Sequence, residues 1–226
     1  MLTLEQVKSK SAGYLVKLHP VVQAGAAELI ERSYARGIPV VITQGMRSIA
    51  QQNALYAQGR TKKGPIVTHA KGGSSYHNYG LAFDFALLLP DGQSVSWDTS
   101  RDGDKDKTAD WQEVVQEAKR LGFEWGGDWT AFKDFPHFQM TFGLTTEQLK
   151  AGRRPTAQQM KDALALINGN DGEADKEVTI TLNGRKISGG FVDNGTTFAP
   201  VRAVAEALGA KVTYDPGNRT VQLITE

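Results

Sequence analysis

Three side chains with the chemistry of a catalytic metal site are His77, Asp84 and His137. The first two belong to the pattern S-x-H-x-x-G-x-A-x-D, and the third lies far downstream in DFPHF. Two neutral imidazoles and one carboxylate form a ligand set that suits catalytic zinc, with the fourth position left for water. Zinc lowers the pKa of such a water from 15.7 to about 7, so hydroxide would be available at neutral pH.

Asp134 is a candidate for the proton acceptor of the same site. It lies three positions before His137, so in an extended or turned segment its carboxylate could face the bound water as a general base. Spacing alone leaves an alternative open, in which each histidine is a hydrogen-bonded or exposed side chain that binds no metal.

A second acidic segment has the spacing of a calcium-binding loop. With its first aspartate as position 1, carboxylates fall at positions 1, 3, 5, 9 and 12, which is the ligand register of an EF-hand, and a helix follows. Lys107 stands where the glycine of the sharp turn is expected. The alternative is an acidic, solvated loop that caps a helix N-terminus. The five candidate ligands are Asp102, Asp104, Asp106, Asp110 and Glu113.

The elements that must position these residues follow from the spacing of apolar side chains. Ser48, with Gln51 three residues later, has the pattern of a helix capping box, and Thr108 is predicted to cap a later helix. Mixed elements with hairpin turns predict an α+β domain around a mainly antiparallel sheet. Helices are predicted over residues 21–36, 48–59 and 108–122, and strands over 38–43, 81–89, FEW and HFQMTF.

The composition changes after about residue 150. We expect a catalytic domain over residues 1–150, because it contains all four histidines and all four tryptophans. Residues 151–176 are interpreted as a linker that contains a short helical run and ends in NGNDGEADK. Residues 177–226 predict a small ββαββ domain, with a hairpin at Asn183-Gly184 and a PGN turn before the last strand.

Composition also limits the partners. The chain has 26 Lys+Arg and 25 Asp+Glu, a formal net charge of +1, which does not favour nucleic acid or an anionic membrane. It has no cysteine, which excludes disulfides and thiolate metal sites. No apolar stretch approaches the roughly 18 residues of a membrane span, and the N-terminus lacks the pattern of a secretory signal peptide.

The two histidine patterns together resemble those of the zinc peptidases that cut D-amino-acid bonds in peptidoglycan. These include D-Ala-D-Ala carboxypeptidases, dipeptidases and the L-alanoyl-D-glutamate endopeptidases of bacteriophage lysins. The resemblance covers most of residues 1–150 and extends to Thr43-x-Gly45-x-Arg47-Ser48. The segments GFEWGGDW and FKDFPHF are most similar to the phage-lysin branch.

The resemblance implies roles for individual residues. His77, Asp84 and His137 match the family's zinc ligands, and Asp134 matches the acidic general base, which is Glu in several relatives. Arg47 matches the arginine that stabilises the oxyanion; from the residues alone it would be interpreted as a surface ion pair. Weaker candidates for substrate binding are Ser75, Gln52 and Trp129, whereas His69 is interpreted as a loop residue.

The implied function is that of a phage-type endolysin, a peptidoglycan hydrolase that uses zinc-activated water to cleave the L-alanoyl-D-glutamate bond of the stem peptide. Two alternatives stay open: a D-Ala-D-Ala carboxypeptidase with the same site, and a wall-binding protein without activity. We expect a protein made in the host cytoplasm, without a signal peptide, that acts on the cell wall after release. A monomer is favoured.

Residues 177–226 resemble the stalk-like domain named from the N-terminus of copper amine oxidases. The segment contains no His, Cys or Met, so copper itself is not implied. In a wall hydrolase the expected role is attachment to the cell wall, with dimerisation or a spacer role as alternatives.

Overall fold

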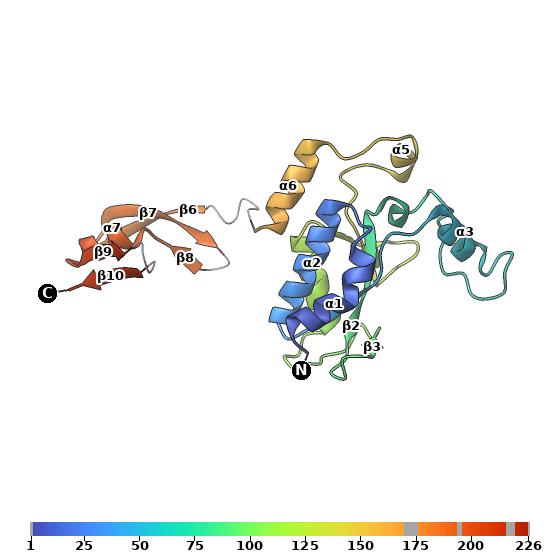
Figure 1. Cartoon of the computed structure of the whole chain (residues 1–226), viewed down its shortest axis with the longest axis horizontal. Helices are drawn as coiled ribbons and strands as arrows, with labels where there is room; N and C mark the ends of the chain where they lie inside the picture. Colours follow the sequence, from blue (N-terminus) through green and yellow to red (C-terminus); the bar gives the residue numbers. More distant parts are fainter. Residues whose placement is uncertain (1, 170–175, 194–195, 216–219, 226) are drawn as a thin grey trace. The chain divides into compact units, whose positions relative to one another are not determined.

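The structure, a computed structural model, describes residues 2–169, 176–193, 196–215 and 220–225. It divides into two compact units, Met1–Ile167 and Asn168–Glu226 (Figure 1). The first unit extends beyond residue 150 because helix α6 (Ala157–Ile167) packs against helix α2 (Pro20–Ala35). Arg32 of α2 donates a hydrogen bond of 3.1 Å to the carbonyl of Ile167. Residues 170–175 of the expected linker lie outside the described residues.

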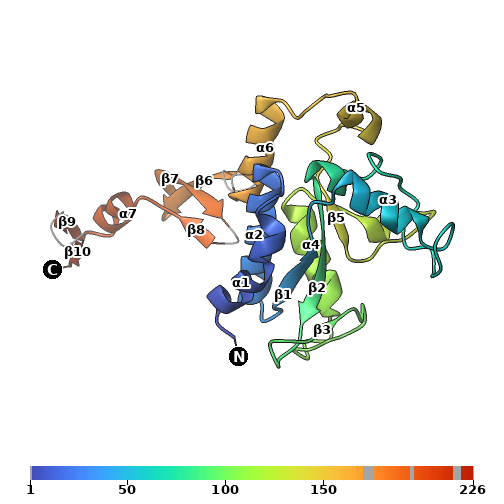
Figure 2. The ribbon, with the colours of Figure 1, turned by 45° about the vertical axis from the view of Figure 1, so that its right-hand side comes forward.

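The first unit is built on a five-stranded antiparallel sheet, in which the predicted α+β class is confirmed. The strand order is β1-β2-β5-β4, with β3 also paired to β2. Strand β2 is therefore central, and Figure 2 shows it side by side with β1. The strands are β1 (Val40–Gln44), β2 (Ala82–Leu88), β3 (Val95–Ser96), β4 (Glu124–Trp125) and β5 (His137–Gln139).

Alternation along the strands separates the core from the site. Phe83, Phe85 and Phe138 are fully buried, and Phe85 packs against Trp111 of helix α4 (Asp110–Arg120) with ring centroids 4.4 Å apart. Successive side chains of a strand point to opposite faces. The residue between the two phenylalanines of β2, Asp84, therefore points to the other face of the sheet.

Helix α1 (Leu4–Leu15) was not predicted from the sequence. Only Val7 and Ser11 of this helix are buried, so its apolar stripe is too narrow to recognise. Ser11 accepts a hydrogen bond of 2.9 Å from the amide of Ile42. That amide belongs to β1, a strand at the edge of the sheet, so α1 covers a backbone group that would otherwise be unpaired.

The two predicted helix caps had different outcomes. Ser48 and Gln51 form the reciprocal capping box of helix α3 (Ile49–Ala57), as predicted. The prediction that Thr108 caps α4 is wrong, because Ala109 is the N-cap and makes no side-chain bond. The amide of Thr108 instead donates to Asp106 at 2.7 Å, so this residue belongs to the preceding loop. The remaining short elements are η1 (Tyr76–Tyr79), η2 (Gly126–Asp128) and α5 (Thr146–Lys150).

The second unit contains the predicted hairpin. Asn183 and Gly184 have φ of 52° and 79°, the two positive values that a type I′ turn requires. Strand β8 is additional to the expected ββαββ order, and the turn at 216–219 lies outside the described residues. The elements of the second unit are β6 (Lys176–Leu182), β7 (Arg185–Asp193), β8 (Thr196–Phe198), α7 (Val201–Ala207), β9 (Lys211–Asp215) and β10 (Thr220–Ile224).

Among the helices of the described chain, none has the length and apolar character needed to cross a membrane.

Candidate metal centre

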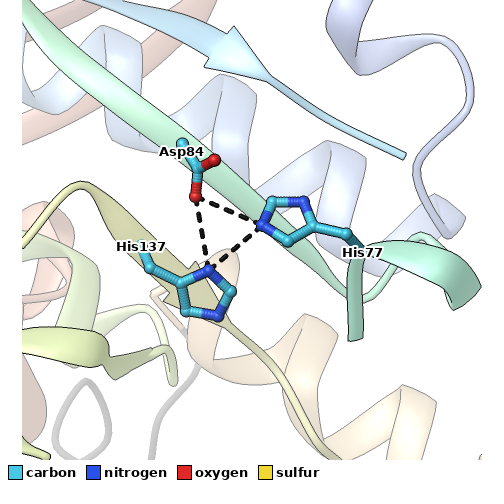
Figure 3. Close-up of side chains that lie close together, drawn as sticks. All are labelled: His77, Asp84 and His137. Carbon is cyan, nitrogen blue, oxygen red and sulfur yellow. Dashed lines mark hydrogen bonds and ion pairs between the residues drawn. The ribbon is translucent and has the colours of Figure 1, made fainter. Parts of the chain in front are cut away.

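Figure 3 shows the side chains of His77, Asp84 and His137 pointing toward one another from η1, β2 and β5. His77 Nε2 lies 3.2 Å from Asp84 Oδ1 and 3.1 Å from His137 Nδ1. The third side of this triangle, from His137 Nδ1 to Asp84 Oδ1, is 3.3 Å. Tetrahedral zinc with bonds of about 2.0–2.1 Å separates its ligand atoms by about 3.3 Å. The three atoms are therefore spaced as a zinc ion requires.

The register of the sheet brings Asp84 and His137 together. Antiparallel β2 and β5 place these two residues directly opposite each other. Their neighbours Phe83 and Phe138, which are also paired, point into the core. A shift of one residue would bury Asp84 among aromatic rings, so the same apolar alternation that forms the core also fixes the polar pair on the opposite face.

The backbone fixes the tautomer of His77. Its Nδ1 lies 2.8 Å from the carbonyl oxygen of Gly45. A carbonyl only accepts hydrogen bonds, so Nδ1 must carry the proton and Nε2 presents its lone pair to the centre. At Gly45 a Cβ atom would lie 2.2 Å from the carbonyl oxygen of Tyr14, so only glycine allows this backbone approach. The glycine of the T-x-G-x-R-S pattern therefore supports the site.

His137 presents Nδ1 to the same point. Its Nε2 lies 3.0 Å from the side-chain oxygen of Gln139, an acceptor, which places the ring proton on Nε2. With both imidazoles neutral and in these tautomers, two nitrogen lone pairs and a carboxylate oxygen converge on one point. Such a set of acceptors is stabilised by a cation, and these residues fit zinc.

The charges of Asp84 and His77 suit this interpretation, whereas His137 must lose any added proton before it can bind a metal. Burial by itself would raise the pKa of Asp84, but the two imidazoles outweigh it and hold the pKa far below its ordinary value. Burial lowers the pKa of His77. Burial also lowers the pKa of His137, but the hydrogen bond to Asp84 and the charge of that carboxylate raise this pKa overall. Asp84 is thus ionised and His77 neutral, the forms that bind a metal.

The centre opens into a cleft of about 670 Å³. The carboxylate of Asp134 lines it, and burial together with the charge of Asp84 raises its pKa. Gly126 makes room for this segment, because a Cβ there would lie 2.4 Å from the carbonyl oxygen of Asp134. Six of the residues discussed above as site candidates line the cleft: Arg47, Ser75, His77, Trp129, Asp134 and His137.

Arg47 is part of this cleft and not a surface side chain. Its Nη2 lies 2.5 Å from Asp84 Oδ2, and 16% of its side chain is exposed. Its backbone amide donates to the carbonyl of His77 at 3.0 Å. Its buried Nε has no hydrogen-bond partner among the described residues. A fixed cation with an unused donor beside the cleft is suited to binding an oxygen that gains negative charge.

The weaker candidates separate into two groups. Trp129 packs against His137 with ring centroids 5.1 Å apart, and Ser75 also lines the cleft. Gln52 is fully buried and does not line it. Its amide donates to the carbonyl of Ala70 at 2.9 Å, so it supports the loop below the cleft. His69, interpreted as a loop residue, lines the cleft next to Phe132 but lies outside the metal triad.

The acidic segment does not support the calcium prediction. Its carboxylates gather as two overlapping groups of three, Asp102–Asp104–Asp110 and Asp104–Asp106–Glu113, and do not form one five-ligand set. Asp110 accepts a hydrogen bond of 2.9 Å from the amide of Gly103. Glu113 is buried against the guanidinium of Arg36. The position-12 ligand thus has a structural partner.

Comparison with known proteins agrees with this geometry. Residues 68–140, which include all three triad members, match the family model described as D-alanyl-D-alanine carboxypeptidase. The peptidoglycan L-alanyl-D-glutamate endopeptidase CwlK of Bacillus subtilis is 58% identical over 123 residues, which cover 54% of this chain and 73% of that protein. The chain belongs to this peptidase family. Its members depend on zinc in general, and the triad is where the present member could hold it.

Two further proteins are similar to this chain. The L-alanyl-D-glutamate peptidase of Listeria phage A118 is 33% identical over 167 residues, 71% of this chain and 53% of the phage protein, so the chain spans about half of that relative. The L-Ala D-Glu endopeptidase ChiX of Serratia marcescens superposes with a TM-score of 0.44 at 26% identity, over 59% of this chain and 88% of that one. Residues 181–226 match the copper amine oxidase N-terminal domain.

Sequence reasoning missed two residues behind His137. Gln139 is buried and accepts the hydrogen bond of His137, and its own amide donates to Glu124 at 2.8 Å. The period-2 alternation of β5 was the available signal, because it places residues 137 and 139 on one face. The position of Glu124 follows only from the pairing of β4 with β5, which sets it opposite Gln139.

Proposed function

We propose that this chain is a peptidoglycan hydrolase that cleaves the bond between L-alanine and D-glutamate in the stem peptide. The observation that carries the proposal is the triangle of acceptor atoms from His77, Asp84 and His137, which lies beside a cleft in a chain 58% identical to CwlK over the matched region. In the proposal these three residues hold the zinc ion.

Zinc bound at this triangle would supply an acidified water and polarise the scissile carbonyl. Asp134 accepts the proton of the attacking water and then delivers it to the leaving amine. Its raised pKa suits this task, because a carboxylate that binds a proton more readily is a better base. Arg47 lines the cleft, and its guanidinium would supply the positive charge that stabilises the developing oxyanion. No covalent intermediate is needed.

The cations around the cleft favour an endopeptidase over a carboxypeptidase. A carboxypeptidase must neutralise the terminal carboxylate of its substrate, which requires a cation that is not otherwise paired. Of the described residues that line the cleft, Arg47 alone has a guanidinium, and no lysine is among them. Because Arg47 is already paired with Asp84, the cleft suits a peptide that continues on both sides of the cut.

The test uses purified Gram-positive peptidoglycan, the zinc-loaded full chain, and a parallel sample with EDTA. Mass spectrometry of the products should show new D-glutamyl amino termini that are absent when EDTA is present. Release of D-alanine without new amino termini would establish the carboxypeptidase in its place. If neither product forms, the inactive wall-binding protein would remain.

For the second unit we propose a role in attachment to the cell wall. The support is the match of residues 181–226 to the copper amine oxidase N-terminal domain, joined here to a wall peptidase. The chain from residue 177 to its end has no His, Cys or Met, so the unit lacks the ligands that copper prefers. Co-sedimentation of the full chain and of residues 1–167 with peptidoglycan tests this role, which requires weaker retention of the shorter chain.

A further inference from the structure

We propose that Glu124 and Gln139 act as a positioning pair that fixes the tautomer of His137 and so orients it toward the metal. Neither residue contacts the centre in this arrangement, and Glu124 acts only through Gln139. The inference rests on the metal triad of the proposed function and extends it to a second layer of the site. The pair lies on two adjacent strands, β4 and β5, which place the two side chains opposite each other.

The side-chain amide of Gln139 can face His137 in two orientations with opposite consequences. With its oxygen toward the ring, the amide accepts a hydrogen bond from Nε2–H. The lone pair is then on Nδ1, the atom that faces His77 and Asp84. With its NH2 group toward the ring, it would require the lone pair on Nε2 and place the ring proton on Nδ1. A proton on Nδ1 would point into the triangle and compete with a metal ion.

Glu124 decides between these two orientations. Its Oε2 lies 2.8 Å from the amide nitrogen of Gln139. A carboxylate only accepts hydrogen bonds, so reversal of the amide would set two oxygen atoms against each other. The other carboxylate oxygen accepts a hydrogen bond of 2.7 Å from the hydroxyl of Thr141, which restrains the carboxylate. The direction of donation therefore runs from His137 to Gln139 to Glu124.

Burial makes the hydrogen bond between His137 and Gln139 important. Gln139 is 6% exposed and His137 is 5% exposed, so water has little access to replace a lost hydrogen bond between them. His77 needs no such support, because the carbonyl of Gly45 fixes its tautomer directly. The two imidazoles of the triad are thus oriented by different means, one by the backbone and the other by a side-chain pair.

The test reverses the acceptor at position 124 in the full chain. In Glu124→Lys a donor faces Gln139 and favours the reversed amide, whereas Glu124→Gln can still present an oxygen. Thr141→Val is the matched control, because it removes the other hydrogen bond of Glu124 and leaves its bond to Gln139. Glu124→Ala and Gln139→Leu complete the set, and thermal unfolding verifies that each variant is folded.

The main readout is zinc affinity, measured by competition with a chelator. We expect Glu124→Lys and Gln139→Leu to weaken zinc binding by about 10–100-fold, with Glu124→Ala between them and the wild type. Glu124→Gln and Thr141→Val should bind zinc as the wild type does. In histidine-labelled, zinc-loaded protein, nitrogen-15 NMR should show the proton of His137 on Nε2.

Each outcome separates this inference from the proposed function. Equal zinc affinity of Glu124→Lys and Thr141→Val, or a His137 proton on Nδ1 in the wild type, would overturn the positioning pair while the metal site remained. A wild-type chain that binds no zinc would overturn both. If the variants follow the expected order but the wild type does not cleave the L-alanine–D-glutamate bond, the pair stands and the proposed reaction fails.

Discussion

The first unit contains two clusters of metal-binding side chains that look comparable in the sequence and differ in the structure. In the triad, His77 and His137 are buried and Asp84 is half-buried, and the three ligand atoms face one another. The acidic loop from Asp102 to Glu113 is mostly exposed, and its buried members already have protein partners. A good ligand spacing is therefore not sufficient for a metal site.

The difference lies in what else the ligand atoms can bind. In the triad, the carbonyl of Gly45 and the side-chain oxygen of Gln139 accept hydrogen bonds from the outer ring nitrogens of the two histidines. Only acceptor atoms then face the centre of the triad. In the loop, Arg36 neutralises Glu113, and backbone amides occupy the aspartates. Carboxylates with such partners gain less from a cation, because their charge is already compensated. The following changes test this contrast, from the largest expected effect to the smallest.

Removal of a triad imidazole should have the largest effect. We expect His137→Ala to lose both the bound zinc and the cleavage of peptidoglycan, because two ligands do not form a catalytic zinc site. Metal analysis after dialysis and the peptidoglycan assay measure the two properties. His19→Gln changes a histidine that does not line the cleft and should retain both. Full zinc occupancy in His137→Ala would show that the ion binds elsewhere.

Removal of the proposed base should separate metal binding from turnover. In Asp134→Asn we expect one zinc ion per chain and a rate lowered by about 10²–10⁴-fold, the usual contribution of general base catalysis. The rate is measured on peptidoglycan at saturating zinc. Asp128→Asn alters another carboxylate that lines the cleft and should leave the rate near that of the wild type. Normal turnover by Asp134→Asn would exclude the assigned base.

Glu113→Ala should act on stability and not on the chemistry. Because Arg36 would lose a buried partner, we expect the free energy of unfolding to fall by about 1–3 kcal/mol, toward the lower end since the guanidinium is 43% exposed. Urea unfolding measures this change. Zinc content and specific activity of the folded protein should be unaltered. An effect on activity that calcium modulates would return Glu113 to the role of a ligand.

The double change Asp104→Asn and Asp106→Asn should have the smallest effect. Both side chains are exposed, so we expect no change in zinc content, activity or unfolding, with or without calcium. Isothermal titration of the zinc-loaded wild type with calcium should produce no binding heat. A calcium-dependent heat that disappears in the double variant would contradict the contrast between the two clusters.

The sequence was sufficient for the elements with a strong local signal. The buried strand at β2, the capping box at Ser48 and the turn at Asn183-Gly184 each depend on neighbouring residues, and the structure contains all of them. Helix α1 was missed because its few buried residues contact the edge of β1. The cap of α4 was missed because the amide of Thr108 bonds to Asp106 within the preceding loop, and Ala109 begins the helix without a side-chain cap.

The site shows the same division. Motifs in the sequence identified His77, Asp84, His137, Asp134 and Arg47 as the candidate residues. The pairing of β2 with β5 decided that Asp84 lies opposite His137. The pairing of β5 with β4 decided that Glu124 lies opposite Gln139. Strand register depends on contacts between residues far apart in the chain, so no local pattern could reveal it. The residue types were readable from the sequence, whereas the tautomers and charges that would let them bind a metal depend on burial and on partners that only the tertiary structure supplies.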